Sequence, residues 1–177
     1  GLLQAKGALG KGSSIGFISS AAGLGWEANL ELLHQYLDTP DFDSAAQWIE
    51  DHRADGFMLS DYMWSKQAIC AYVARSAMGL LKQGIRINAI CPGPTDTPLA
   101  RANADMWLGF GQDYREEVGI EASTPLEQAF ALVFLCSDAA SVITGQTIIT
   151  DAGYFPSGVT GSFPAATPVA QFLLGRM

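Results

Sequence analysis

Tyr62 and Lys66 form a Y-x-x-x-K motif, which has the spacing and the residue types for proton transfer. Residues four apart on a helix lie on the same face, so the phenol and the ammonium group would be neighbours. A positive charge beside a phenol favours the phenolate and lowers a pKa that is ordinarily about 10. Such a phenol can pass a proton to or from an alcohol oxygen. Taken alone, the motif fits a half-exposed polar pair on an amphipathic helix better.

A second pattern, residues 12–16, matches the G-x-S-x-G motif of serine hydrolases, with Ser14 as nucleophile and His34 or His52 as base. That motif requires a strand, a turn and a helix in this order, whereas here an apolar strand follows the serine. A hydrolase is therefore a remote alternative. The glycine-rich residues 7–12 have the same inverted context for a phosphate-binding loop, and we expect a simple turn there.

The composition is that of one acidic globular domain. The 177 residues include 10 Lys and Arg against 18 Asp and Glu, which gives a net charge of −8 and a pI of about 4.5. The hydrophobic share of 49% and the charged share of 16% exclude a disordered acidic tail. Because no run of basic residues exists to neutralise phosphates, we expect neither nucleic acid nor an anionic membrane as partner.

The three cysteines, Cys70, Cys91 and Cys136, are widely spaced and form no C-x-x-C pair, so we expect buried reduced thiols and no metal site. The longest apolar run, residues 129–136, has 8 residues, far fewer than the ~20 that cross a bilayer. No signal-peptide pattern opens the chain, and the default expectation is a cytoplasmic protein.

The apolar periodicity predicts alternating strands and helices, as in α/β proteins. Gly84 is placed to end a long helix before a strand, and residues 124–127 have the spacing of a capping box with Pro at the first helical position. The expected elements are a strand at 15–19, a helical hairpin at 27–55, a helix at 60–82, a strand at 85–91, a mobile stretch at 99–119, a helix at 125–137, a strand at 146–150, and an irregular tail from 155 with a short apolar end at 169–174.

Four segments occur in an order that identifies a family: residues 18–23 at a strand end, the helix with Tyr62 and Lys66, residues 88–98, and residues 144–153. Together they resemble the short-chain dehydrogenase/reductase family from its fourth helix to its C-terminus. The resemblance covers almost the whole chain. It implies a Rossmann-like, doubly wound parallel sheet of the α/β class, of which residues 1–177 would be the C-terminal part as a single domain.

By this resemblance, Ser20 holds the substrate oxygen, Tyr62 is the acid/base, and Lys66 binds the nicotinamide ribose and favours the phenolate. Ser19 is the nearest rival of Ser20, but the serine three residues before Gly23 fits the family pattern better. The cofactor is NAD or NADP, with no means of choosing between them. The residues expected to contact it are Tyr62, Lys66, Pro92, Gly93, Thr95 and Thr97, the two threonines meeting its carboxamide and phosphates.

Two departures from the family pattern stand out. Ser20 and Tyr62 are 42 residues apart, much farther than in most members, and residues 27–55 are the insertion. This insertion and the turn at 92–98 are similar to the branch of bacterial 3α-hydroxysteroid dehydrogenase/carbonyl reductase-like members. The second departure is that the glycine-rich dinucleotide loop, the residue that selects NAD or NADP, and the active-site Asn are not in the sequence. We therefore expect a fragment or one part of a nicked enzyme, with an open apolar edge on the strand at 15–19.

The resemblance implies an oxidoreductase that interconverts a secondary alcohol and a ketone by hydride transfer. Residues 99–119 lie where the family closes a lid over its substrate, and their apolar side chains favour a bulky hydrophobic, steroid-like or aromatic substrate. These side chains are Met106, Trp107, Leu108, Phe110 and Tyr114. An equally weighted alternative is that they only pack the lid down. The main alternative of another class is a non-catalytic subunit or pseudoenzyme.

The hairpin also bears on assembly, since we expect a homo-oligomer, a dimer or a tetramer. Its apolar stripe must be buried, and we expect it to fold over the helix at 60–82 and obstruct the usual dimer face. The stripe consists of Leu30, Leu33, Leu37, Trp48 and Ile49. Association would then use the strand at 146–150 and the apolar tail at 169–174, through a two-fold interface. The alternative is a flap at the active site that leaves the usual face open.

Overall fold

Three parallel strands form the centre of the computed structural model, which describes residues 6–53 and 60–175. The strands β1 (Ser14–Ile18), β2 (Arg86–Pro92) and β3 (Thr147–Thr150) lie in the order β1-β2-β3, with Ile15 opposite Ile87 and Ala89 opposite Thr147. The predicted α/β class and all three predicted strands are confirmed. Among the described residues β1 pairs only with β2, and Ile18 at its end is 54% exposed.

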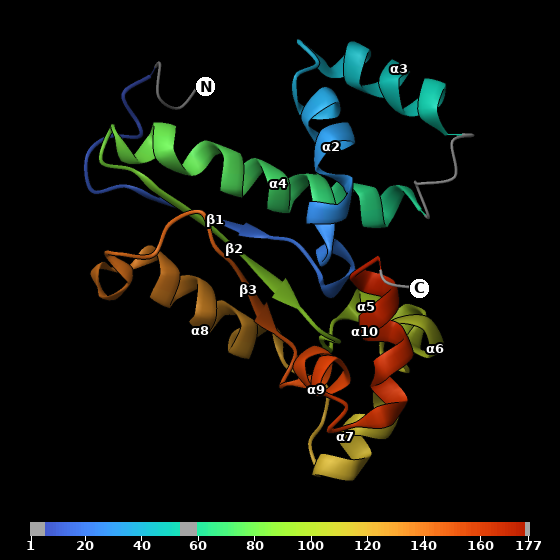
Figure 1. Cartoon of the computed structure of the whole chain (residues 1–177). Helices are drawn as coiled ribbons and strands as arrows, with labels where there is room; N and C mark the ends of the chain where they lie inside the picture. Colours follow the sequence, from blue (N-terminus) through green and yellow to red (C-terminus); the bar gives the residue numbers. More distant parts are fainter. Residues whose placement is uncertain (1–5, 54–59, 176–177) are drawn as a thin grey trace.

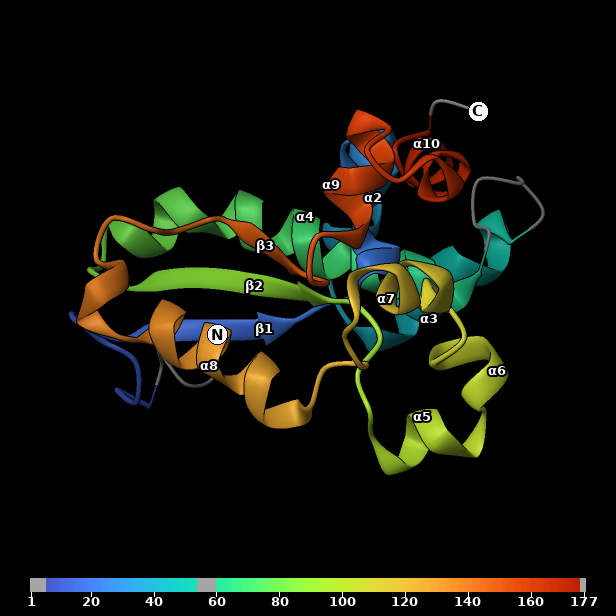
Figure 2. The same cartoon turned by 90° about the horizontal axis from the view of Figure 1, so that it is seen from below.

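Helices cover both faces of this sheet, as parallel strands require. The long helix α4 (Asp61–Leu81) lies on one face and α8 (Pro125–Cys136) on the other (Figure 1, Figure 2). The predicted signals explain their ends, because the Ser60 hydroxyl accepts from the Met63 amide and Gly84 adopts a left-handed φ of 73°. The predicted capping box between Thr124 and Glu127 is present at the start of α8.

The predicted hairpin consists of α2 (Leu30–Leu37) and α3 (Phe42–His52), after a short 3₁₀ turn at Trp26–Asn29. Leu33 is fully buried in a cluster with Trp64, Ala68 and Ala71 of α4, with Tyr36, Leu37, Trp48 and Ile49 packed around it. The hairpin therefore packs on α4 as predicted, although Leu30 points outward and is not part of the buried stripe. Residues 54 and 55 of the predicted hairpin lie outside the described residues, and the consequence for assembly stays a prediction.

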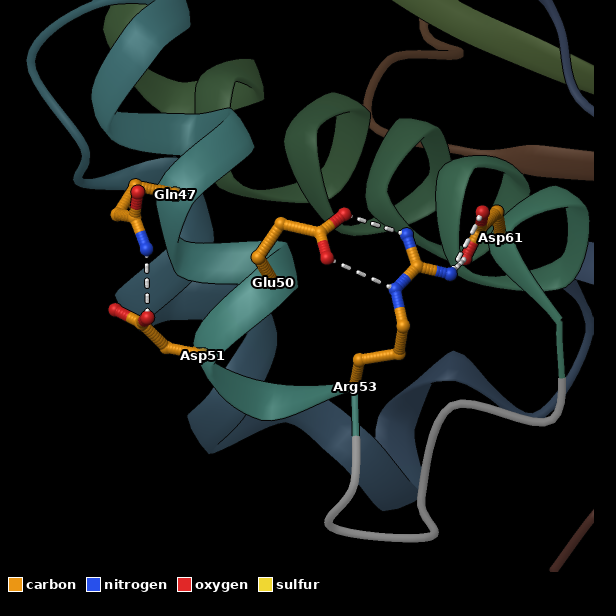
Figure 3. Close-up of polar contacts among 5 residues, drawn as sticks. All are labelled: Gln47, Glu50, Asp51, Arg53 and Asp61. Carbon is orange, nitrogen blue, oxygen red and sulfur yellow. Dashed lines mark hydrogen bonds and ion pairs between the residues drawn. The ribbon is translucent and has the colours of Figure 1, made fainter.

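Exposed polar contacts join the end of α3 to the start of α4 (Figure 3). The Arg53 guanidinium donates to Glu50 at 2.8 Å and to Asp61 at 3.2 Å, and Gln47 donates to Asp51 at 2.7 Å. Ion pairs as exposed as these contribute little to stability, because solvent and salt screen them. The buried apolar cluster around Leu33 is thus the main attachment of the hairpin.

The predicted mobile stretch is instead built from three short helices, α5 (Pro98–Ala102), α6 (Ala104–Trp107) and α7 (Gln112–Val118). Side chains supply the hydrogen bonds that such short elements need. The Thr97 hydroxyl accepts from the Ala100 amide at 3.0 Å, and Arg115 donates to the carbonyl groups of Leu108 and Phe110. These bonds are made by polar side chains, so the apolar pattern from which the elements were predicted carries no signature of them.

The C-terminal tail is also more regular than predicted, with α9 (Tyr154–Thr160), a 3₁₀ turn at Pro164–Ala166 and α10 (Thr167–Leu173). Pro156 is tolerated because it lies in the first turn of α9, where its missing N–H has no helical partner. The Asp151 carboxylate accepts from the amides of Gly153 and Phe155 at 2.9 and 2.8 Å and so caps this helix. Among the helices of the described residues, none has the length and apolar character to cross a bilayer.

The cysteine prediction is correct in two of three cases. Cys70 and Cys91 are buried and free, with their sulfur atoms 3.9 Å apart between α4 and β2. Cys136 is exposed, contrary to prediction. The reason is its position in the last turn of α8, beside Gly16 on the open edge strand β1.

Candidate active site

A cavity of about 950 Å³ opens at the carboxyl ends of the strands, where α5, α6, α7 and α10 gather (Figure 1, Figure 2). Open α/β sheets bind ligands at this end. Most of the residues predicted for a dehydrogenase site line this one cavity, although they come from distant segments: Ser20, Tyr62, Lys66, Pro92, Gly93, Thr95, Thr97, Met106, Trp107 and Phe110.

Tyr62 and Lys66 lie in the first two turns of α4 and face the cavity together. The Lys66 ammonium is 5.6 Å from the centre of the Tyr62 ring and donates to the Ile18 carbonyl at 3.3 Å. This second contact ties the lysine to the end of β1. The Tyr62 ring is 40% exposed and meets Trp107 of α6 edge to face, with 5.2 Å between ring centres. The pair therefore combines a held cation with a phenol that a ligand can reach.

The two adjacent serines differ in what they can do. Ser19 is almost fully buried, donates to the Lys66 carbonyl at 2.8 Å and accepts from the Cys70 thiol at 3.3 Å. Ser20 is less buried, and its hydroxyl oxygen accepts from the Ala22 amide at 3.2 Å. Accepting a bond leaves the Ser20 O–H free to donate into the cavity, whereas the Ser19 O–H is already engaged. The geometry therefore favours Ser20 over Ser19 as the hydroxyl that can donate to a ligand in the cavity.

The segment after β2 forms a tight turn beside the end of β3. A Cβ atom on Gly93 would come within 2.8 Å of the Asp151 Cβ, so only glycine allows this approach without a shift. Thr95 donates to the Gly93 carbonyl at 3.0 Å and forms an isolated bridge with Ser123. Thr97 caps α5 as an acceptor, and its own O–H remains available to a ligand.

Of the apolar side chains predicted for the lid, some line the cavity and others pack the lid on the rest of the fold. Met106, Trp107 and Phe110 line the cavity, whereas Leu108 and Tyr114 do not. Tyr114 donates to the Ala152 carbonyl at 2.9 Å and so holds the lid down. Phe110 lines the cavity and also helps to hold the lid down, since it packs edge to face on Tyr154, with 5.2 Å between ring centres.

Two walls of the cavity, one on α8 and one on α10, were not predicted as part of the site. Pro168, Val169, Phe172 and Leu173 of α10 line the cavity. The sequence does contain a signal for an amphipathic helix, because these positions recur four residues apart. Nothing in that local pattern says which surface the helix covers.

The hydrolase alternative has no structural support. Ser14 begins β1 instead of following a strand, and its hydroxyl donates to the Leu135 carbonyl of α8 at 3.2 Å. His34 and His52 belong to the hairpin, which packs on α4 on the other face of the sheet (Figure 1). A serine nucleophile and its base must lie within hydrogen-bond reach of each other.

Comparison with known proteins decides the family. A family model described as Enoyl-(Acyl carrier protein) reductase, one of the short-chain dehydrogenase families, matches residues 52–155, more than half of the chain. The chain belongs to the short-chain dehydrogenase/reductase family. Members of this family are oxidoreductases that bind NAD(P)H.

Curated relatives agree with this assignment. General stress protein 39 of Bacillus subtilis is 40% identical over 99 residues, which cover 55% of this chain and 34% of the relative. The 2,5-dichloro-2,5-cyclohexadiene-1,4-diol dehydrogenase of Sphingobium indicum is 35% identical over 99 residues, which cover 55% of this chain and 39% of the relative. The chain thus spans little more than a third of the length of these relatives.

Among solved structures, the 3-alpha-hydroxysteroid dehydrogenase from Pseudomonas sp. B-0831, complexed with NADH, aligns with a TM-score of 0.63 at 25% identity. The alignment covers 86% of this chain and 59% of that one. Ribose-5-phosphate isomerase from Brucella melitensis 16M aligns with a TM-score of 0.53 at 23% identity and shows the fold alone. The sheet of this chain therefore matches the C-terminal part of the family's Rossmann fold.

Proposed function

We propose that this protein is the part of an NAD(P)-dependent oxidoreductase that binds a secondary alcohol or ketone and moves the proton of the reaction. The observation that carries the proposal is the convergence of Ser20, Tyr62 and Lys66 on one cavity from the end of β1 and the start of α4. The lining of α6 and α10 is apolar, which favours a hydrophobic substrate of steroid-like or aromatic size.

The proton transfer follows from the chain's own groups. The Tyr62 phenol gives its proton to the ketone oxygen during reduction and takes one from the alcohol during oxidation. The nearby Lys66 ammonium stabilises the negative charge that the phenol oxygen gains when it gives up the proton. The Ser20 hydroxyl, which already accepts from Ala22, donates to the substrate oxygen and holds it near the phenol.

The donor set also fits the nicotinamide end of the cofactor, which supplies or accepts the hydride when bound. An ammonium has three N–H donors, and one of those of Lys66 is directed to Ile18, so others can reach ribose hydroxyls. Thr97 offers a further hydroxyl donor at the same cavity. In the part of the chain that the structure describes, no G-x-G-x-x-G turn joins a strand to a helix. The proposal therefore assigns the pyrophosphate to polypeptide other than these residues.

The test compares two tyrosines on the same helix in the native holoenzyme. Tyr62 and Tyr72 are 40% and 41% exposed, and Tyr72 packs on Phe17 away from the cavity. Tyr62→Phe should lower kcat for ketone reduction by at least about 100-fold, which is the usual effect of losing a general acid. Tyr72→Phe should leave kcat nearly unchanged.

Lys66→Ala should lower kcat and also weaken the binding of NADH or NADPH, measured by fluorescence titration. Near-normal turnover of the Tyr62→Phe variant would refute the assignment. A holoenzyme that neither binds NAD(P)H nor reduces any ketone would instead favour the second candidate, a non-catalytic subunit.

A further inference from the structure

The C-terminal helix α10 packs on the fold with one face and lines the cavity with another. Ala170 and the preceding Ala166 are buried toward α9, where the Ala166 carbonyl would lie 2.6 Å from a Cβ atom on Gly158. The other face carries Val169 and Phe172 into the cavity. Because one face is packed on the fold, the position of the other face is fixed relative to the sheet.

The end of α10 is also docked on the segment that carries Ser20. Leu173 packs in the cluster of Ala21 and Leu24, directly after Ser20. Its carbonyl lies so close to Gly25 that a Cβ atom there would be 1.6 Å from the carbonyl oxygen. The helix is therefore held from both sides, by α9 and by the turn that follows Ser20.

The side chains that α10 presents to the cavity have no polar atoms. Phe172 is 38% exposed although it belongs to a helix with a buried apolar face. Exposed apolar side chains that line a cavity are typical of ligand contacts, because a ligand covers them on binding. Such side chains can bind the apolar body of a substrate but not its reacting oxygen.

We propose that α10 is a specificity-determining wall of the substrate site, with Val169 and Phe172 contacting the apolar body of a bulky ketone or alcohol. The inference rests on the proposed function for its substrate class. It assigns to the apolar tail a role at the site, in place of the predicted role of residues 169–174 in association. It also explains why the wall is anchored beside Ser20: the groups that hold the oxygen and the body of the substrate belong to one packed unit.

The experiment measures both catalysis and binding for Phe172→Ala. In the native holoenzyme, kcat/KM is determined for acetone and for a steroid-sized ketone such as androstenedione. We expect Phe172→Ala to lower kcat/KM for the large ketone by about tenfold or more, since lost apolar contacts in a site act on this scale. The value for acetone should change by less than about twofold, because acetone has no apolar body to reach α10.

The matched controls are Phe42→Ala on α3, where the side chain is 84% exposed and outside the cavity, and Phe172→Leu, which keeps an apolar contact. Phe42→Ala should change neither value, and Phe172→Leu should restore most of the value for the large ketone. Equal losses for both ketones, or no loss for the large one, would overturn the proposal.

A second readout separates this inference from the proposed function. Equilibrium dialysis measures the Kd of the large ketone without turnover, and Phe172→Ala should raise that Kd by about tenfold if α10 contacts the substrate. If the wild-type protein binds the ketone but reduces none, and the variant binds it more weakly, the proposed reaction is wrong and the role of α10 stands. An unchanged Kd in a protein that does reduce ketones overturns the role of α10 alone.

Discussion

Replacing Leu33 by alanine tests whether the hairpin is held on α4 by its apolar cluster. Leu33 is 0% exposed and contacts Trp64, Ala68 and Ala71. Removing a leucine side chain from such a site loses its transfer free energy and leaves a cavity, together about 3 kcal/mol. For a chain of this length each kcal/mol lowers Tm by about 2–4 °C, so we expect a decrease of roughly 6–12 °C.

The assays are thermal denaturation, which gives Tm, and urea denaturation, which gives the free energy of unfolding, both followed by tryptophan fluorescence. This fluorescence reports on the cluster because Trp48 and Trp64 stack with 5.5 Å between ring centres. The matched control is Leu30→Ala in the same helix, where the side chain is 38% exposed and the free energy of unfolding should change by less than about 1 kcal/mol. Equal effects of the two substitutions would refute the reasoning, because the hairpin would then not depend on the buried leucine.

Three further predictions concern the turn below α10, the cap of α8 and the thiols. Gly25→Ala should lower the free energy of unfolding, measured by urea titration, by clearly more than Gly161→Ala. Both glycines have φ near 72°, but only at Gly25 would the added Cβ atom clash with a carbonyl, that of Leu173. Equal losses in the two variants would contradict this reasoning. Hydrogen bonds from Thr124 hold the pKa of Glu127 below its usual value. Because the pKa is lower in the folded state, the ionised carboxylate stabilises the fold above its unfolded pKa, and this stabilisation is lost as the pH falls. The difference in stability between the wild type and Glu127→Ala should therefore shrink below about pH 4. A difference that does not depend on pH would contradict the assignment. A thiol reagent should label Cys136 in the native protein, and Cys70 and Cys91 only after denaturation, with the labels counted by mass spectrometry. Fast labelling of more than one thiol in the native protein would show that Cys70 and Cys91 are not both buried.

Much of the fold follows from local patterns in the sequence. Apolar runs bounded by glycine and polar residues predicted all three strands, apolar spacing predicted the extent of α4, and Gly84 predicted its end. The four-residue spacing of Tyr62 and Lys66 sufficed to place both side chains on one face. These features depend on residues within one or two turns of each other, and for that reason the sequence determines them without knowledge of the fold.

Other features were decided by tertiary contacts. The lid helices are held by distant segments, since Tyr114 donates to the Ala152 carbonyl and Trp107 packs on the Tyr62 ring, and α9 is held by its packing on α10. The exposure of Cys136 depends on the open edge of β1, not on its apolar neighbours in sequence.

The site shows the same division. The sequence alone placed Tyr62 and Lys66 on one face of a helix, because that is a matter of spacing within one helix, and their role in proton transfer stays a prediction. Only the tertiary structure decided that Ser19 is occupied by the Lys66 carbonyl and that α10 closes the cavity beside Ser20. An amphipathic helix must bury its apolar face, but the surface that it covers is set by the shape of the rest of the fold, such as the space that Gly25 leaves for the end of α10.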